Sequence, residues 1–284
     1  MRHRRACVGG LVVALVSVGP LIASAASGHD LWLEPPPPSA PGDLVTVEAR
    51  IGHTGHAGEA RGEAVRRDAA RIVRLEAHGP ATGPSALPGI DGQAPLGVLR
   101  PAEPGPWVLA YETRPFRHTL PAARFAAYLE EEGLDRVAHA RRVEGTLETP
   151  GRELVSRAVK MLLAVGDSAP ADRRIGLPVE LIAEQMPAPG EGGTLALRVE
   201  VGGAPRSGVL VDLDALDRPS GPVRAERTGA DGRVRFSIEP GRWLATAVHA
   251  RPFDGATGRA GDAESPAWRT VFAAWTVDLR APGS

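Results

Sequence analysis

The chain has a single cysteine, Cys7, and a single lysine, Lys160, among 284 residues. Cys7 lies in the N-terminal apolar segment, so cleavage of that segment leaves a mature protein without a thiol. Neither disulfide bonds nor thiolate metal sites are then available. Any metal ion would be held by imidazole, by carboxylate or by a free amino terminus.

Three further absences exclude classes of function. Beyond the N-terminal segment, no apolar run approaches the roughly 20 residues that cross a bilayer, so no stable membrane insertion is expected after cleavage. The formal net charge is −1, and no basic stripe is available to follow a phosphate backbone, which argues against nucleic-acid binding. Catalytic motifs such as a nucleophile elbow, a phosphate-binding loop or a zinc-protease helix are missing. We therefore do not expect an enzyme.

The N-terminus has the features of a secretory signal peptide. Three arginines within the first five residues precede an apolar run from Val8 to Ala23, and Ala23-Ser24-Ala25 has the small-x-small pattern of a cleavage site. We expect a signal peptide over 1–25, with later cuts after Ala26 or Gly28 left open. An uncleaved anchor is the alternative. The mature protein is expected in the periplasm or outside the cell.

Short alternating segments bounded by glycine and proline predict a mainly β protein. We expect two β-sandwich-like domains, at 29–185 and 191–281, on either side of the Pro/Gly-rich stretch 186–193. Strands are predicted at 44–51, 71–78, 107–112, 194–201, 208–213, 233–238, 243–249 and 273–279. The periodicity of 155–165 is ambiguous, and a strand is favoured towards its end.

The first domain is predicted to carry a short helical insertion at 120–142. Thr119 is the expected N-cap, and Pro121 falls in the first turn, where its missing N–H costs nothing. Gly133 should end the first helix, with a second helix over 134–142. The acidic run 130–132 is interpreted as a solvated face of the first helix.

Histidines are the leading ligand candidates in a chain without thiols. His53 and His56 lie in a glycine-rich segment, where two imidazoles three residues apart can converge on one ion. Two solvated loop histidines are the alternative. His29 follows the cleavage region. If the cut comes after Gly28, the amino group and ring of His29 can chelate one ion, a geometry that suits copper.

Two other histidines are weaker candidates. His249 ends a predicted strand and has a partly buried structural role as its alternative, and His118 precedes the helical insertion as a possible partner of its cap. His78 and His139 are interpreted as structural or solvated.

Several segments occur in an order that is similar to a known family. They are His29-Asp-Leu-Trp-Leu33 after the signal, the Gly-His element at His53, and the ranges 120–134, 156–166, 176–180, 228–236 and 241–249. Together they resemble the domain of unknown function 4198 family, also described as NikM-like and linked to periplasmic parts of nickel and cobalt uptake. The resemblance implies a secreted, β-sandwich-rich protein whose C-terminal module is like carboxypeptidase regulatory or transthyretin-like domains. It also implies binding of transition-metal ions.

We therefore expect an exported protein that binds nickel, cobalt or copper and serves a membrane metal transporter as an accessory. The expected ligands are His29, His53, His56 and His249, with His118 in reserve. The alternative is a β-sandwich interaction module that binds a protein or a glycan without metal. In that case some of the five tryptophans would be exposed platforms, although core packing is their more common role.

Overall fold

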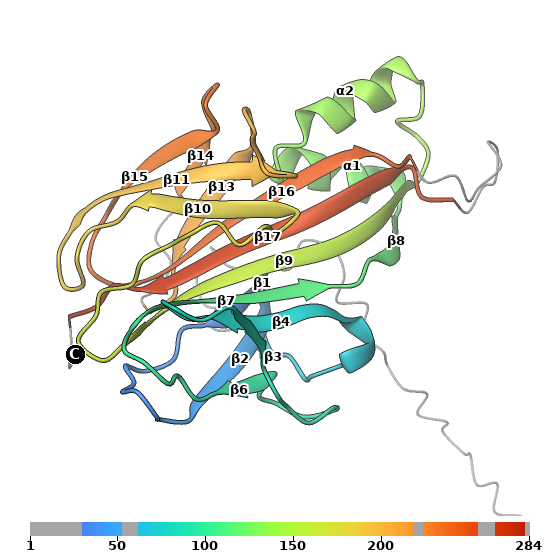
Figure 1. Cartoon of the computed structure of the whole chain (residues 1–284). Coiled ribbons are helices and arrows are strands. Elements are labelled where there is room, and N and C mark those ends of the chain that lie inside the picture. Colours follow the sequence, from blue (N-terminus) through green and yellow to red (C-terminus); the bar gives the residue numbers. More distant parts are fainter. Residues whose placement is uncertain (1–29, 53–61, 218–223, 255–264, 282–284) are drawn as a thin grey trace, which may run out of the picture.

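The computed structural model describes residues 30–52, 62–217, 224–254 and 265–281 (Figure 1). The fold is mainly β, as predicted, with one large sheet and two small ones. None of the helices in these ranges has the length and apolar character needed to span a membrane.

The large sheet has nine strands and contains segments from both predicted domains. In spatial order it runs through β14 (Arg224–Arg227), β13 (Leu210–Ala215), β16 (Arg242–Pro252), β17 (Trp268–Asp278), β9 (Gly151–Val165), β7 (Gly105–Thr113), β4 (Ile72–His78) and β5 (Pro84–Ala86), while β8 (Phe116–Leu120) also pairs with β9. Among the strand pairs of the described ranges, only β17–β9 is parallel. This pair joins the two halves of the chain into one sheet.

A small sheet covers one face of the large one and completes a β-sandwich (Figure 1). It is formed by β10 (Val179–Gln185), β11 (Gly193–Val201), β12 (Ala204–Pro205) and β15 (Arg233–Ile238). Leu195 and Leu197 of β11 pack with Val211 and Trp275 of the large sheet in the main core. The predicted boundary at 186–193 falls in the connection between β10 and β11, inside this small sheet.

The other face of the large sheet is covered in two parts. A second small sheet, formed by β1 (Asp30–Glu34), β2 (Val45–Gly52), β3 (Glu63–Ala64) and β6 (Gly97–Leu99), packs Trp32 and Leu33 against Met161 of β9. Helices α1 (Ala122–Glu131) and α2 (Asp135–Val143) pack on the same face near Val155. A single-turn 3₁₀ helix (Ala69–Arg71) leads into β4.

The helical insertion ends as predicted but begins differently. Gly133 has φ +62°, the left-handed conformation that favours glycine after a helix. The Thr119 N-cap prediction is wrong, because Thr119 lies in β8 opposite Arg152 of β9. Pro121 occupies the cap position of α1, and no side chain caps this helix.

The predicted strands are otherwise present, and the ambiguous segment 155–165 belongs to the 15-residue strand β9. This strand is covered on both faces, which explains its nearly continuous apolar sequence. The five tryptophans, at positions 32, 107, 243, 268 and 275, are at most 5 % exposed. The interpretation of tryptophans as exposed platforms is therefore wrong, and all five are core residues.

Candidate functional site

Three of the predicted ligands, His29, His53 and His56, lie outside the described residues, but the residues next to them in the chain are described. Asp30, which follows His29, is the register partner of Gly52, which precedes His53. Directly opposed residues of an antiparallel pair have Cα atoms about 4.5–5.5 Å apart. The structure therefore brings the neighbours of two predicted ligands together at one end of the β1–β2 pair.

The chain returns to the same place at Gly62. A Cβ atom added to Gly52 would lie 2.8 Å from the Cα atom of Gly62, and one added to Gly62 would lie 2.7 Å from the Trp32 ring. Gly62 also has φ +50°. Only glycine fits two backbones this close to one indole ring. Both ends of the segment that contains His53 and His56 are thus held beside Asp30 by close packing on Trp32.

Ionisable side chains from three other parts of the chain, two carboxyl groups and one guanidinium group, interact with this end of β1. Asp30 acts electrostatically on Glu132, just after α1, and on Asp212 of β13. Arg157 of β9 faces the same group and is 5 % exposed. We refer to Asp30, Glu132, Asp212 and Arg157 as the junction cluster, because they lie where the helices, the β1 sheet and the large sheet meet.

The junction cluster has more negative than positive charge. Burial, followed by the charges of Asp30 and Asp212, raises the pKa of Glu132 to about 8. Burial and the charge of Asp30 raise the pKa of Asp212 to about 6. Arg157 interacts with Asp30 and Glu132, and protonation or a nearby cation would relieve the remaining repulsion among the three carboxyl groups. The interpretation of 130–132 as a wholly solvated face is wrong for Glu132, which is half-buried.

Tyr128 of α1 lies beside the junction cluster. It is 5 % exposed, and its hydroxyl has no hydrogen-bond partner within the described part of the chain. Burial, together with the charges of Glu153 and Glu132, raises the pKa of Tyr128 well above its usual value. The Tyr128 hydroxyl adds a buried polar atom to this region, near the carboxyl groups of Glu153 and Glu132.

The junction cluster is not a complete metal site. Across the four described ranges, no group of three or more histidine, aspartate or glutamate side chains has a geometry that could hold a metal ion. A metal centre at this place would need ligands from the neighbouring histidines of the sequence.

The structure does not bring His118 and His249 together. His118 of β8 lies opposite Glu153 of β9, with its Nδ1 atom 3.7 Å from Glu153 Oε2. His249 of β16 points to the opposite face of the large sheet, because side chains alternate along a strand. Strands β9 and β17 separate their two strands, a distance of about 14 Å at the usual strand spacing.

His249 lies in a basic environment. It lines a pocket of about 220 Å³ between the α1–α2 turn and the 206–209 turn. Burial, followed by the charges of Arg206, Arg136 and Arg251, lowers the pKa of His249 to about 4. Its imidazole is therefore neutral at neutral pH, but the surrounding guanidinium groups oppose the approach of a cation.

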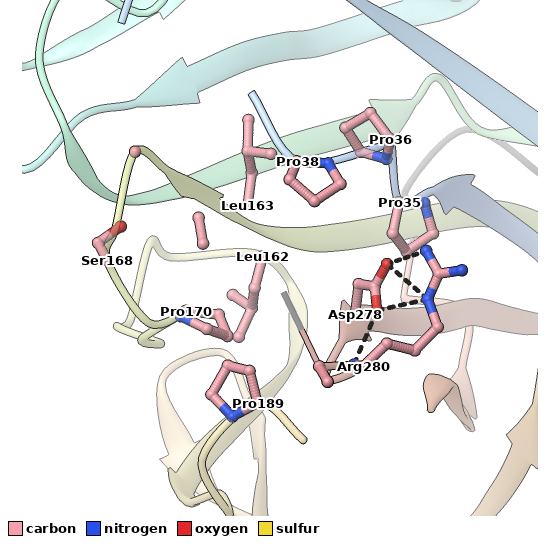
Figure 2. A pocket seen from close by; sticks show the side chains of 13 residues that line it. Pro35, Pro36, Pro38, Leu162, Leu163, Ser168, Pro170, Pro189, Asp278 and Arg280 are labelled. Atoms are coloured by element: carbon pink, nitrogen blue, oxygen red, sulfur yellow. Dashed lines mark hydrogen bonds and ion pairs between the residues drawn. The ribbon is translucent and has the colours of Figure 1, made fainter. Parts of the chain in front are cut away.

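A second pocket, of about 110 Å³, lies at the other end of the sandwich and is shown in Figure 2. Prolines at 35, 36, 38, 170 and 189 and the side chain of Leu163 form its apolar walls. Its charged groups, Asp278 and Arg280, pair with each other, with Arg280 Nε 3.0 Å from Asp278 Oδ1. This pocket offers no set of convergent polar groups for a specific ligand.

Sequence reasoning missed the junction cluster and also missed a buried ion network around Lys160. The Lys160 Nζ atom lies 2.6 Å from Glu180 Oε1 and 3.0 Å from Asp172 Oδ1, and it donates to the Leu181 carbonyl. One signal was available, because the only lysine of the chain stands inside an apolar run. No comparable signal marks Arg157, since arginine is abundant throughout this sequence.

Two comparisons with known proteins bear on this site. Residues 26–251 match the model of a family described as a domain of unknown function, DUF4198. No curated protein gives a match. The matched range contains His29, the junction cluster and the pocket at His249.

Proposed function

This chain belongs to the DUF4198 family, and we propose that it is an exported periplasmic protein that binds a transition-metal ion. His29, His53 and His56 supply imidazole ligands, and the junction cluster provides negative charge beside them. Nickel, cobalt and copper are the candidate ions, because imidazole suits them and the mature chain has no thiol. The protein serves metal uptake or handling as an accessory to a membrane transporter.

The observation that carries this proposal is the register pair Asp30–Gly52. It links the sequence neighbours of His29 and His53, two histidines that are 24 positions apart in the chain. Gly62, which follows the segment that contains His56, lies against Gly52 of the same pair. The described residues that flank the three histidines in the chain therefore lie in one small region of the fold, which supports coordination of a common ion by these histidines.

The charges of the junction cluster support the proposal independently. Three carboxyl groups with one guanidinium group create a negative potential where Asp30 begins β1. The raised pKa values of Glu132 and Asp212 mean that ionisation of these groups is unfavourable without an added positive charge. A divalent cation supplies that charge and lowers such pKa values.

His118 and His249 are left out of the proposed ligand set. His249 is surrounded by three arginines on the opposite face of the large sheet. His118 is 13 % exposed and lies against Glu153, whose other oxygen accepts the hydroxyl of Thr270. The carboxylate thus already has a structural partner in β17.

Calorimetric titration of the mature protein with Ni²⁺, Co²⁺ and Cu²⁺ tests the proposal. Loss of even a group that orients a metal ligand lowers affinity about 10–100-fold, so the His53→Ala/His56→Ala variant should bind at least that much more weakly. His139→Ala, which changes an exposed histidine of α2, is the matched control and should bind like the wild type. Equal affinity of the double variant and the control would refute the proposed ligands.

Mass spectrometry of the exported protein identifies its N-terminal residue and so tests the proposed role of His29. A start at His29 gives the ion an amino-terminal chelate, and His29→Ala should then lower copper affinity most. A start at Ala26 or Ser27 leaves His29 as a side-chain ligand only, and the three ions should lose affinity to a similar extent. Retention of the intact N-terminal segment would contradict processing by signal cleavage.

A further inference from the structure

We propose that the pocket at His249 binds a small oxyanion of the phosphate or carboxylate class. The pocket, about 220 Å³ in volume, is formed by the first turn of α2, the 206–209 turn and residues 248–250 of β16. We call it the basic pocket. It opens where the β13–β16 register ends at Val211–Ala247, so that β16 continues to His249 without β13 beside it.

Arg227 holds two walls of the basic pocket together. Its Nη1 atom donates to the carbonyls of Gly133 and Gly208, each at 3.1 Å, and its Nη2 atom lies 2.9 Å from Asp135 Oδ2. A side chain at position 133 would collide with this guanidinium group, since an added Cβ would lie 2.9 Å from Nη2. The charges of Arg227 and Asp135 offset each other, so this pair shapes the pocket without adding net charge.

The remaining charge of the basic pocket is positive. Arg136 and Arg206 line it, and neither forms an ion pair with any carboxylate in the described ranges. Both act electrostatically on His249. Guanidinium groups bind carboxylate and phosphate oxygens through paired N–H donors, and such charge-assisted hydrogen bonds are among the stronger ones in proteins. Two unpaired guanidinium groups in one pocket therefore favour an oxyanion.

Two further donors point in the same direction. The N-cap of α2, Leu134, provides no side-chain hydrogen bond, and its carbonyl accepts from the amides of Val137 and Ala138. The amides of the first two helical residues are left for another acceptor, at the positive end of the helix dipole. The half-buried His249 is neutral, so one of its ring nitrogens carries an N–H that a ligand could accept. These N–H groups add hydrogen-bond donors for an oxyanion, and the arginines supply its countercharge.

The inference goes beyond the proposed metal centre and does not depend on it. His249 and the junction cluster lie on opposite faces of the large sheet. The same arginines that oppose a cation at His249 attract an anion. The two sites can therefore be tested separately in metal-free protein.

Calorimetric titration of the metal-free mature protein with inorganic phosphate and with succinate, at low ionic strength, tests the inference. Saturable binding of at least one probe is expected, and the tighter probe identifies the tetrahedral or the carboxylate class. Each lost charge-assisted contact lowers affinity about tenfold, so Arg136→Gln/Arg206→Gln should bind at least tenfold more weakly. Arg235→Gln, an exposed arginine of β15 outside the pocket, is the control and should change affinity less than about twofold.

Two results would overturn the inference. One is failure of the wild type to bind either probe more tightly than about 10 mM. The other is equal affinity of the double variant and Arg235→Gln. Because Arg136 is exposed and Arg206 half-exposed, the double variant should keep the wild-type circular dichroism spectrum and unfolding midpoint. In a second measurement, the better-binding probe should raise the unfolding temperature of the wild type and of Arg235→Gln but leave that of the double variant unchanged.

Discussion

Strand β9 carries two buried cations, Lys160 and Arg157, whose surroundings differ. They lie an odd number of positions apart and therefore point to opposite faces of the large sheet. Lys160 is inside the sandwich and is 1 % exposed, while Arg157 belongs to the junction cluster on the other face and is 5 % exposed. Each belongs to a group with more carboxyl groups than cations, and the carboxylates around Lys160 accept hydrogen bonds from backbone and side-chain groups.

In the network around Lys160, each carboxylate oxygen of Asp172 and Glu180 has an ion-pair or hydrogen-bond partner. Glu180 accepts the backbone N–H groups of Ile175, Gly176 and Leu177. Asp172 accepts from the amide of Ala183 and from the Trp275 ring, both on the same oxygen. Buried charges that are paired and hydrogen-bonded are compatible with stability, although they add less than apolar packing would.

Burial raises the pKa of Asp172 against the charge of Lys160 and several hydrogen bonds, whereas in the junction cluster neighbouring carboxylates add to the effect of burial. Glu132 and Asp212 have strongly raised pKa values, with Asp30 as the main charged cause in both cases. Perturbed carboxyl groups of this kind are common at functional sites. Burial of a charged side chain therefore does not by itself distinguish a structural group from a functional one. The two groups differ in the sign of the neighbouring charge, because Lys160 opposes the effect of burial on the pKa of Asp172 while Asp30 adds to it at Glu132 and Asp212.

The largest effect is expected from Lys160→Met. The substitution keeps most of the side-chain volume but leaves Asp172 and Glu180 buried without their cation. Removal of one partner of a buried ion pair costs about 3–5 kcal/mol, which urea unfolding at pH 7 would measure. A loss below about 1 kcal/mol would show that the network contributes little and would weaken the comparison. Lys160→Met/Asp172→Asn should recover part of the loss.

A smaller effect of opposite sign is expected from Glu132→Gln. The pKa of Glu132 is about 8 in the folded protein and near 4.5 in the unfolded chain. The unfolded state therefore releases its proton first, and the metal-free wild type should lose stability as the pH rises from about 4.5 to 8. Because Glu132 is only half-buried, we expect the variant to be more stable by about 1 kcal/mol at pH 8 and unchanged at pH 4.

Urea unfolding of wild type and Glu132→Gln over that pH range measures the difference. Glu130→Gln, at an exposed position of the same helix, is the matched control and should follow the wild-type profile. If the free energy of unfolding depends on pH in the same way in Glu132→Gln and in the wild type, ionisation of Glu132 does not destabilise the folded protein, and the proposed difference from the Lys160 network is wrong.

The smallest effect is expected from Asp212→Asn. Burial and the charge of Asp30 raise the pKa of Asp212 from 3.8 to about 6, a narrower window than for Glu132. Stability of the wild type should fall between about pH 4 and 6 through this group, and the gain from the substitution should be complete near pH 7. Nuclear magnetic resonance of the carboxyl carbons would follow the titration directly. An apparent pKa near 4 for Asp212 would contradict its place in the cluster.

Much of the secondary structure could be predicted from local sequence. The segments 194–201 and 233–238 alternate clearly because one side of β11 and of β15 faces the core. Gly133 marks the end of α1 because its left-handed φ is unfavourable for other residues. Thr119 was misleading, since a good capping residue also fits a strand and the β8–β9 pairing outweighed the local preference.

The candidate site could be predicted only in part. The histidines are visible in the sequence because the one cysteine stands at position 7, so imidazoles are the main nitrogen or sulfur ligands in the rest of the chain. Their surroundings are not visible, since Asp30, Glu132, Arg157 and Asp212 come from four distant segments. The run 130–132 illustrates the difficulty, because helical periodicity does not reveal that Glu132 lies under the β1 end while its neighbours remain exposed.

The sequence by itself determined the class of fold, the positions of most strands and the confinement of the one cysteine to position 7. Those properties depend on residue type and on patterns within a few positions. Only the tertiary structure decided that both halves of the chain share one sheet, through the parallel pair β17–β9. It also decided which charges meet on each face of that sheet. Such contacts depend on strand order and register, which are set by packing over the whole chain and not by any local pattern.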